Sequence, residues 1–123
     1  MYTLDTNVVL YYLNKEEEVI SLISNLVAQN SALTVATVSE VELFAYPNLS
    51  ETEETNIRNI LKTIYSIPLD SRIANQAAIL KRTHTMKLGD SIIAATAVLT
   101  GSTLLTRNVR DFKKIPGLKL QKI

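Results

Sequence analysis

The sequence predicts a single α/β domain built on a largely parallel sheet, and two observations lead to this fold class. Short apolar runs of strand length alternate with helical patterns along the whole chain. This alternation is typical of a parallel sheet with helices on both faces and right-handed crossovers. A length of 123 residues, of which 46% are hydrophobic, fits one domain with a packed core.

The first third of the chain predicts two strands and two helices. An apolar run over residues 1–4 predicts the first strand, and apolar residues 8–13 predict a short helix. Three glutamates at positions 16–18 begin a second helix, because acidic side chains favour the first turn. Apolar residues then recur at helical spacing to position 27. Residues 32–36 predict the second strand.

The middle of the chain contains two sequences with the form of a capping box. Thr37-Val38-Ser39-Glu40 predicts the start of one helix, and Ser50-Glu51-Thr52-Glu53 predicts the start of the next. Residues 66–69 predict a third strand, in which Pro68 favours an edge position. Asp70 then stands where a residue that caps the following helix is expected.

The last third contains a helix that is apolar almost all round, which predicts burial. Leu88-Gly89-Asp90 introduces this helix and Gly101 ends it. Residues 103–106 predict a fourth strand, a polar loop is expected over 107–111, and residues 118–120 predict the last strand.

Composition excludes several classes of site and compartment. The chain has no cysteine and one histidine, which excludes a disulfide scaffold, a thiolate zinc site and a cysteine nucleophile. We interpret His84 as a surface or half-buried residue. No run approaches the roughly 20 apolar residues of a membrane span, and the amino terminus lacks the pattern of a secretory signal. We therefore expect a cytoplasmic protein.

Charge is unevenly distributed along a chain whose net charge is +1. The segment from Glu16 to Ile57 has no lysine or arginine, whereas Asp111 is the only acid after position 106. This asymmetry would allow a polyanion to bind on one side, although a well-solvated surface explains it equally. The basic residues that would contact the backbone of such a polyanion, an RNA if the family resemblance described below holds, are Arg107, Arg110, Lys113 and Lys114.

Four acids are candidates for a shared site. Asp5 follows the first strand, where its position fits a helix cap and a site residue equally. Asp90 begins the buried helix, and an unpaired carboxylate there needs a cation or backbone donors. Residues two apart on a helix face different sides, so only one of Glu40 and Glu42 can join Asp5. We favour Glu42, because Glu40 already completes a capping box.

The fourth candidate, Asp111, lies after the fourth strand, where a turn-forming role is the common alternative. Thr106 and Asn108 in the same region would orient a neighbouring carboxylate. Because ligand sites form beyond the carboxyl ends of parallel strands, we expect these groups to meet Asp5 there. Four carboxylates repel one another, and Mg²⁺ or Mn²⁺ suits such an all-oxygen site. The site would activate water for attack on a phosphodiester.

Four blocks of the chain resemble the PIN domain, specifically the small VapC-type toxins. The third and fourth blocks, followed by Ile115-Pro116-Gly117, are the most specific. The blocks are Asp5-Thr6-Asn7, Ser39-Glu40-Val41-Glu42-Leu43, Asp90-Ser91-Ile92-Ile93-Ala94-Ala95-Thr96-Ala97 and Leu105-Thr106-Arg107-Asn108-Val109-Arg110-Asp111-Phe112.

The resemblance implies a three-layer α/β/α sandwich on a mostly parallel sheet of about five strands, and RNA cleavage that depends on Mg²⁺ or Mn²⁺. It implies that Asp5, Glu42 and Asp90 bind the metal and that the hydroxyl of Thr6 supports them. The family often has a fourth acid near Asn108, which is neutral here, so Asp111 would be a weaker fourth acid. Implied partners are the RNA substrate, a second copy in a homodimer, and a small antitoxin that covers the acidic groove.

Two alternatives remain beside this reading. The neutral Asn108 favours a catalytically impaired module of the same fold that binds RNA or protein. A phosphotransferase with Asp5 as its nucleophile is disfavoured, because the position two residues on is Asn7 rather than a second acid.

Overall fold

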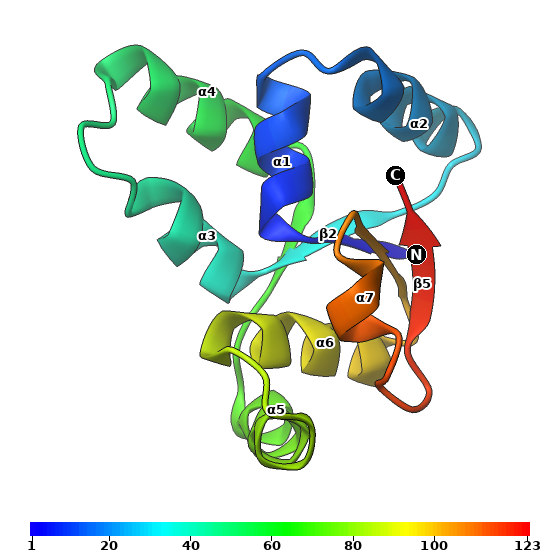
Figure 1. Cartoon of the computed structure of the whole chain (residues 1–123). Coiled ribbons are helices and arrows are strands. Elements are labelled where there is room, and N and C mark those ends of the chain that lie inside the picture. Colours follow the sequence, from blue (N-terminus) through cyan, green and yellow to red (C-terminus); the bar gives the residue numbers. More distant parts are fainter.

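A computed structural model describes all 123 residues and has a five-stranded sheet with helices on both faces (Figure 1). The chain thus has the fold class that the sequence predicts. The elements in chain order are β1 (Tyr2–Leu4), α1 (Thr6–Leu13), α2 (Glu17–Ala28), β2 (Leu33–Ala36), α3 (Thr37–Phe44), α4 (Glu51–Leu61), β3 (Tyr65–Ile67), α5 (Ser71–His84), α6 (Leu88–Thr100), β4 (Thr103–Thr106), α7 (Val109–Phe112) and β5 (Lys119–Lys122).

The sheet has the strand order β3-β2-β1-β4-β5, and every neighbouring pair is parallel. The chain runs outward from β1 through β2 to β3, then returns to place β4 on the other side of β1. The direction of winding therefore reverses between β1 and β4. In open parallel sheets, ligands bind at such a reversal, beyond the carboxyl ends of the strands. Here those ends are followed by Asp5 and Arg107.

Two apolar cores lie on opposite faces of the sheet, because successive residues of a strand point in opposite directions. Leu4 and Leu105 are partners in register and belong to the core beneath α1, α2 and α4. Leu104 points to the other face, where it packs with residues of α5, α6 and α7. Figure 1 shows these two groups of helices on either side of the strands.

Helix α6 forms the centre of the second core, as its apolar composition predicts. Residues 91–97 are all buried, and Gly101 ends the helix with a φ of 69°. Because α6 is fixed along its length by packing, its first turn and Asp90 are held in place relative to the sheet. No helix is both long enough and apolar enough to cross a membrane.

Of the two predicted capping boxes, the second is confirmed and the first is wrong. Ser50 and Glu53 exchange both hydrogen bonds of a capping box at the start of α4. Strand β2 runs directly into α3, so Thr37 is already inside the helix and no side chain caps this end. The Thr37 hydroxyl instead accepts a hydrogen bond from the backbone N–H of Leu69 at 3.2 Å.

The loop expected over 107–111 is also corrected, because residues 109–112 form the short helix α7. Phe112 is fully buried in the second core and fixes this turn against the sheet. Asp70 is confirmed as a cap, since its carboxylate accepts a hydrogen bond from the backbone N–H of Ile73 at 2.9 Å.

Candidate active site

Asp5 stands at the helix-cap position of α1 but does not act as its cap. Its backbone is extended, and its side chain makes no cap hydrogen bond. The carboxylate turns instead toward β4, where Oδ2 accepts a hydrogen bond from the Thr106 hydroxyl at 2.7 Å. Asp5 is only 7% exposed. This geometry separates the two readings of Asp5 that are equal on position alone and favours the site residue.

Thr106 joins Asp5, through hydrogen bonds, to the short segment between β4 and α7. Its hydroxyl donates to Asp5 and accepts a hydrogen bond from the backbone N–H of Asn108 at 2.9 Å. The Asn108 side-chain amide donates in turn to Asp111 Oδ2 at 3.0 Å. Asn108 therefore holds the Asp111 carboxylate, which is exposed on α7.

Glu42 is joined to the residue after Asp5 through a short chain of hydroxyls. The Thr6 hydroxyl donates to Glu42 Oε1 at 2.7 Å and lies 2.7 Å from the Ser39 hydroxyl. Because the single proton of Thr6 points to the carboxylate, Ser39 is the donor in the second bond. Ser39 is fully buried. Ser39 is not among the site residues that the sequence predicts, although its spacing of three residues from Glu42 places both on one helix face.

Glu40 points away from this site, as its separation from Glu42 predicts. Its carboxylate accepts a hydrogen bond from the Ser66 hydroxyl of β3 at 3.0 Å. The local role of Glu40 is therefore to join α3 to the edge of the sheet, and not to complete a capping box with Thr37.

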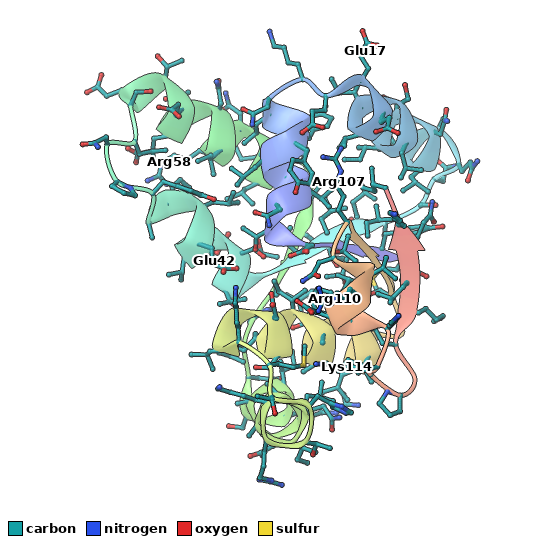
Figure 2. The ribbon with its side chains drawn as sticks, viewed as in Figure 1. Glu17, Glu42, Arg58, Arg107, Arg110 and Lys114 are labelled. Carbon is teal, nitrogen blue, oxygen red and sulfur yellow. The ribbon has the colours of Figure 1, made fainter.

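The Glu42 carboxylate also lies against the first turn of α6. An added Cβ at Gly89 would stand 3.0 Å from Glu42 Oε2 and 3.3 Å from its Cδ. Gly89 directly precedes Asp90, so Glu42 and Asp90 approach each other across the junction of α3 and α6. Figure 2 shows Glu42 on α3 beside the start of α6.

The electrostatics show that these carboxylates face one another. Burial raises the pKa of Asp5, against the effect of hydrogen bonds from Thr106 and the Thr6 backbone, and the charge of Glu42 adds to the rise. Burial also raises the pKa of Asp90, followed by the charges of Asp5 and Glu42, whereas Lys87 lowers it. Asp111 raises the pKa of Asp90 by a smaller amount.

The donor chemistry of this site fits a divalent cation. Asp5, Glu42 and Asp90 offer only oxygen ligands, which Mg²⁺ and Mn²⁺ prefer. Gly89 has no side chain, and the Glu42 carboxylate occupies the space that a Cβ there would need. The structure has no group of three acidic or histidine side chains close enough together to hold a metal ion, and like charges repel one another at short range. A cation between them would relieve the repulsion that raises the pKa of Asp90.

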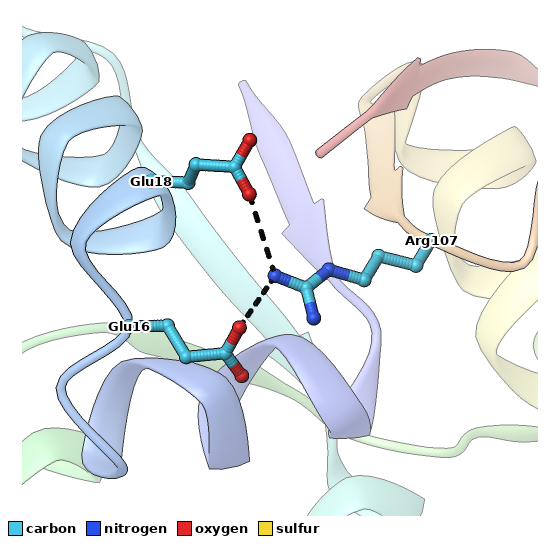
Figure 3. Close-up of polar contacts among 3 residues, drawn as sticks. All are labelled: Glu16, Glu18 and Arg107. Carbon is cyan, nitrogen blue, oxygen red and sulfur yellow. Dashed lines mark hydrogen bonds and ion pairs between the residues drawn. The ribbon is translucent and has the colours of Figure 1, made fainter.

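Arg107 is bound on the other side of the β4–α7 connection (Figure 3). Its Nη2 lies 2.7 Å from Glu16 Oε1 and 3.9 Å from Glu18 Oε2, and its guanidinium lies 4.0 Å from the centre of the Tyr11 ring. The hydrogen bond to Glu16 is the main cause of a raised pKa of Arg107. Arg107 thus ties this connection to the start of α2.

The other three basic candidates are exposed and make no salt bridge. Arg110 lies on α7, and Lys113 and Lys114 follow it. Figure 2 shows Arg107 directed toward α1 and α2, whereas Arg110 and Lys114 lie beside α7. His84 is the half-buried last residue of α5, away from any group of metal-binding side chains.

A cleft of about 340 Å³ lies apart from the carboxylates, between α1, α4 and the α3–α4 connection. Its apolar lining comes from Leu10, Leu13, Leu49 and Ile57, with Tyr46 at its side. None of the candidate site residues lines this cleft.

Comparison with known proteins shows the family and the fold of the chain. Residues 2–118 match the family model of the PIN domain. The chain is 28% identical to Ribonuclease VapC2 of Rickettsia felis, over 98% of this chain and 96% of that protein. A toxin–antitoxin complex from Klebsiella pneumoniae contains a chain of similar structure, with a TM-score of 0.80, 28% identity and coverage of 96% and 95% of the two chains.

The crystal structure of VapBC2 from Rickettsia felis, bound to a DNA fragment from its promoter, contains a chain with the same fold. Its TM-score is 0.86 at 23% identity, over 99% of this chain and 98% of that chain. The match to the family model extends over nearly the whole chain and includes all candidate site residues from Asp5 to Asp111. The chain therefore belongs to the PIN domain family.

Proposed function

We propose that this protein is a metal-dependent endoribonuclease and the toxin of a toxin–antitoxin pair. The observation that carries the proposal is the place of the Glu42 carboxylate, which binds Thr6, the residue after Asp5, and lies against Gly89, the residue before Asp90. These residues follow β1 or begin α6 near the point where the sheet reverses its winding. Membership of the PIN domain family and the likeness to a protein named Ribonuclease VapC2 support the reaction class.

In this proposal Asp5, Glu42 and Asp90 hold Mg²⁺ or Mn²⁺. When bound, the cation polarises phosphoryl oxygens and activates water for attack on the phosphodiester. Thr106 orients the Asp5 carboxylate from β4, and Thr6 orients Glu42 from α1, each through a bond of 2.7 Å. These two bonds fix the ligand oxygens before the metal arrives, which reduces the reorganisation that binding requires.

The connection after β4 would supply the supporting part of the site. Asn108 is neutral, so Asp111 is the only residue of this connection that carries a carboxylate. The Asn108 amide holds that carboxylate through a hydrogen bond. Asp111 faces Asp90 closely enough to raise its pKa. We assign Asp111 a role in the catalytic site that is weaker than those of the other three acids.

Arg110, Lys113 and Lys114 are proposed to hold the RNA backbone. They are exposed and make no salt bridge, and contacts to phosphates position RNA without reading its sequence. We leave Arg107 out of this set, because its guanidinium is already neutralised by Glu16.

A small antitoxin is the proposed protein partner, because similar structures are those of complexes named VapBC or toxin–antitoxin. The apolar cleft between α1 and α4 offers a surface for a segment of this partner. We also propose the homodimer that the family resemblance implies. Expression of this chain alone should arrest growth. Co-expression of an adjacent reading frame that encodes a small antitoxin-like protein should restore growth. Sedimentation equilibrium of the purified chain should give the mass of a dimer.

The nuclease proposal is tested with three aspartate variants. Asp5→Asn and Asp90→Asn should reduce Mg²⁺-dependent cleavage of an RNA ladder to the level without enzyme, and neither should lower the Tm measured in chelator. Asp70→Asn is the matched control: Asp70 only caps α5, asparagine caps equally well, and full activity is expected. Full activity in Asp5→Asn and Asp90→Asn would reject the assignment. Metal-induced stabilisation of the natural protein without any cleavage would favour the catalytically impaired alternative.

A further inference from the structure

Gly89 is in close contact with the carboxylate of Glu42. All three carboxyl atoms lie within 3.5 Å of the position that a Cβ would take, at 3.0 Å for Oε2, 3.3 Å for Cδ and 3.5 Å for Oε1. The carboxylate therefore faces Gly89 across the space that a Cβ would fill, one residue before Asp90. Ordinary van der Waals contact begins at 3.4 Å, so a methyl group at Gly89 would displace this carboxylate by a few tenths of an ångström.

The backbone does not require glycine at this position. Gly89 lies inside α6, whereas the glycines with positive φ are Gly101 and Gly117. Alanine favours a helix over glycine, because glycine loses more conformational freedom on folding. The fold alone would thus be better served by alanine, and the missing side chain of Gly89 needs another explanation.

The second contact of the carboxylate comes from α1. Oε1 accepts the hydrogen bond from Thr6, whose hydroxyl is held by the buried Ser39. A side chain at Gly89 would shift the carboxylate and disturb this bond. The position of Glu42 is therefore set by a hydroxyl of α1 and by the missing side chain of α6.

We propose that Gly89 is a positioning residue whose missing side chain lets the Glu42 carboxylate take the place from which it binds metal beside Asp90. This inference rests on the proposed function, and it adds a residue that acts through Glu42 rather than on the substrate. It also predicts which metal is affected most. Mg²⁺ requires near-octahedral geometry at about 2.0–2.1 Å, whereas Ca²⁺ accepts flexible geometry at about 2.3–2.6 Å.

The test is the Gly89→Ala variant, with metal binding measured by titration calorimetry in the absence of RNA. The Kd for Mg²⁺ should rise about tenfold, the effect typical of a group that supports a metal ligand. The Kd for Ca²⁺ should change by less than about threefold, because its coordination adapts to a small displacement. In chelator, the Tm of the variant should equal or exceed that of the natural protein.

Cleavage kinetics give a second reading of the same variant. At low Mg²⁺ its kcat should fall, and saturating Mg²⁺ should restore it, whereas the KM for RNA should stay unchanged. Leu88→Ala is the control in the same turn: Leu88 is 63% exposed, and the Glu42 contact involves its neighbour. Its Mg²⁺ affinity should match that of the natural protein.

Three results would overturn the inference. Unchanged Mg²⁺ affinity in Gly89→Ala would show that the Glu42 carboxylate is not displaced. An equal loss for Mg²⁺ and Ca²⁺ with a lowered Tm would show general damage to the fold. An equal loss in Leu88→Ala would assign the effect to the whole turn. Failure of the proposed function is distinguished by the natural protein itself, which would then not cleave RNA, whether or not it binds Mg²⁺.

Discussion

At the scale of single residues, Asp5 shows how a carboxylate can cost stability and still be kept. It is almost fully buried, and its neighbours include the negative charge of Glu42. Only hydrogen bonds from Thr106 and the Thr6 backbone offset these effects, and the pKa of Asp5 remains raised. A residue retained only to cap α1 would instead point at the helix and gain stability from it.

The raised pKa of Asp5 predicts a pH dependence of stability. The folded protein binds this proton more tightly than the unfolded chain, whose value is 3.8. The contribution of Asp5 to stability is therefore fully present below pH 3.8 and is lost as the pH rises through the raised pKa. Asn cannot lose a proton, and its carbonyl can still accept the bond from Thr106.

In chelator, Asp5→Asn should thus be more stable than the natural protein at pH 7, and the difference in Tm should disappear in acid. Calorimetry from pH 4 to pH 8 measures this, with Asp70→Asn as the control that keeps the natural profile. A variant that is less stable than the natural protein at pH 7 would show that Asp5 stabilises the fold as a charge.

At the scale of elements, the end of α5 is strained. Thr85 closes this helix in the left-handed conformation with a φ of 53°, which crowds the side chain of a β-branched residue. Thr85→Gly should therefore raise the free energy of unfolding by about 0.5–1 kcal/mol.

Urea denaturation measures this gain, and Thr83→Gly is the matched control. Thr83 is an exposed residue inside the same helix, where glycine should lower stability by a few tenths of a kcal/mol to about 0.5 kcal/mol. Equal effects of the two substitutions would contradict the assignment of strain to Thr85.

The elements also show what the sequence can predict and what it cannot. The order of the five strands and of helices α1–α6 follows from apolar periodicity, and the Ser50 capping box is closed by its own neighbours, so both are predicted correctly. The four-residue helix α7 is too short to give such a pattern and is missed. The Thr37 box fails because β2 runs directly into α3, which puts Ala36, a residue without a polar side chain, at the cap position. Glu40 then binds Ser66, which lies 26 residues away in sequence.

The candidate site follows the same rule. The acids Asp5 and Asp90 can be chosen from the sequence, because each stands beside an apolar element in a parallel fold. Gly89 cannot be chosen in this way, since its role depends on a contact with a different helix. The pairing of Arg107 with Glu16, 91 residues apart, is equally invisible. These roles depend on contacts between elements that are distant in sequence, and the local sequence pattern does not predict such contacts.

At the scale of the whole molecule, the distribution of charge assigns different tasks to neighbouring basic residues. Arg107 is neutralised by Glu16 and stacks on Tyr11, whereas Arg110, Lys113 and Lys114 keep their charges in solvent. Only free charges release counterions from RNA when they bind phosphates. The salt dependence of RNA affinity should therefore come from the second group.

Neutralising Arg110, Lys113 and Lys114 together with glutamine should lower the slope of log Kd against log salt by up to about 2, at roughly 0.7 per phosphate contact on a single strand. Filter binding measures this slope for a short RNA, in the Asp5→Asn background so that no cleavage occurs.

The matched control neutralises Lys62, Arg72 and Arg82, which are also exposed and lie on or beside α4 and α5. Both triple variants have the same net charge. If RNA binds beside α7, the slope should therefore fall only in the variant of Arg110, Lys113 and Lys114. The Arg107→Gln variant should keep the slope of the natural protein. A similar fall in both triple variants would mean that RNA responds to total charge rather than to the residues beside α7.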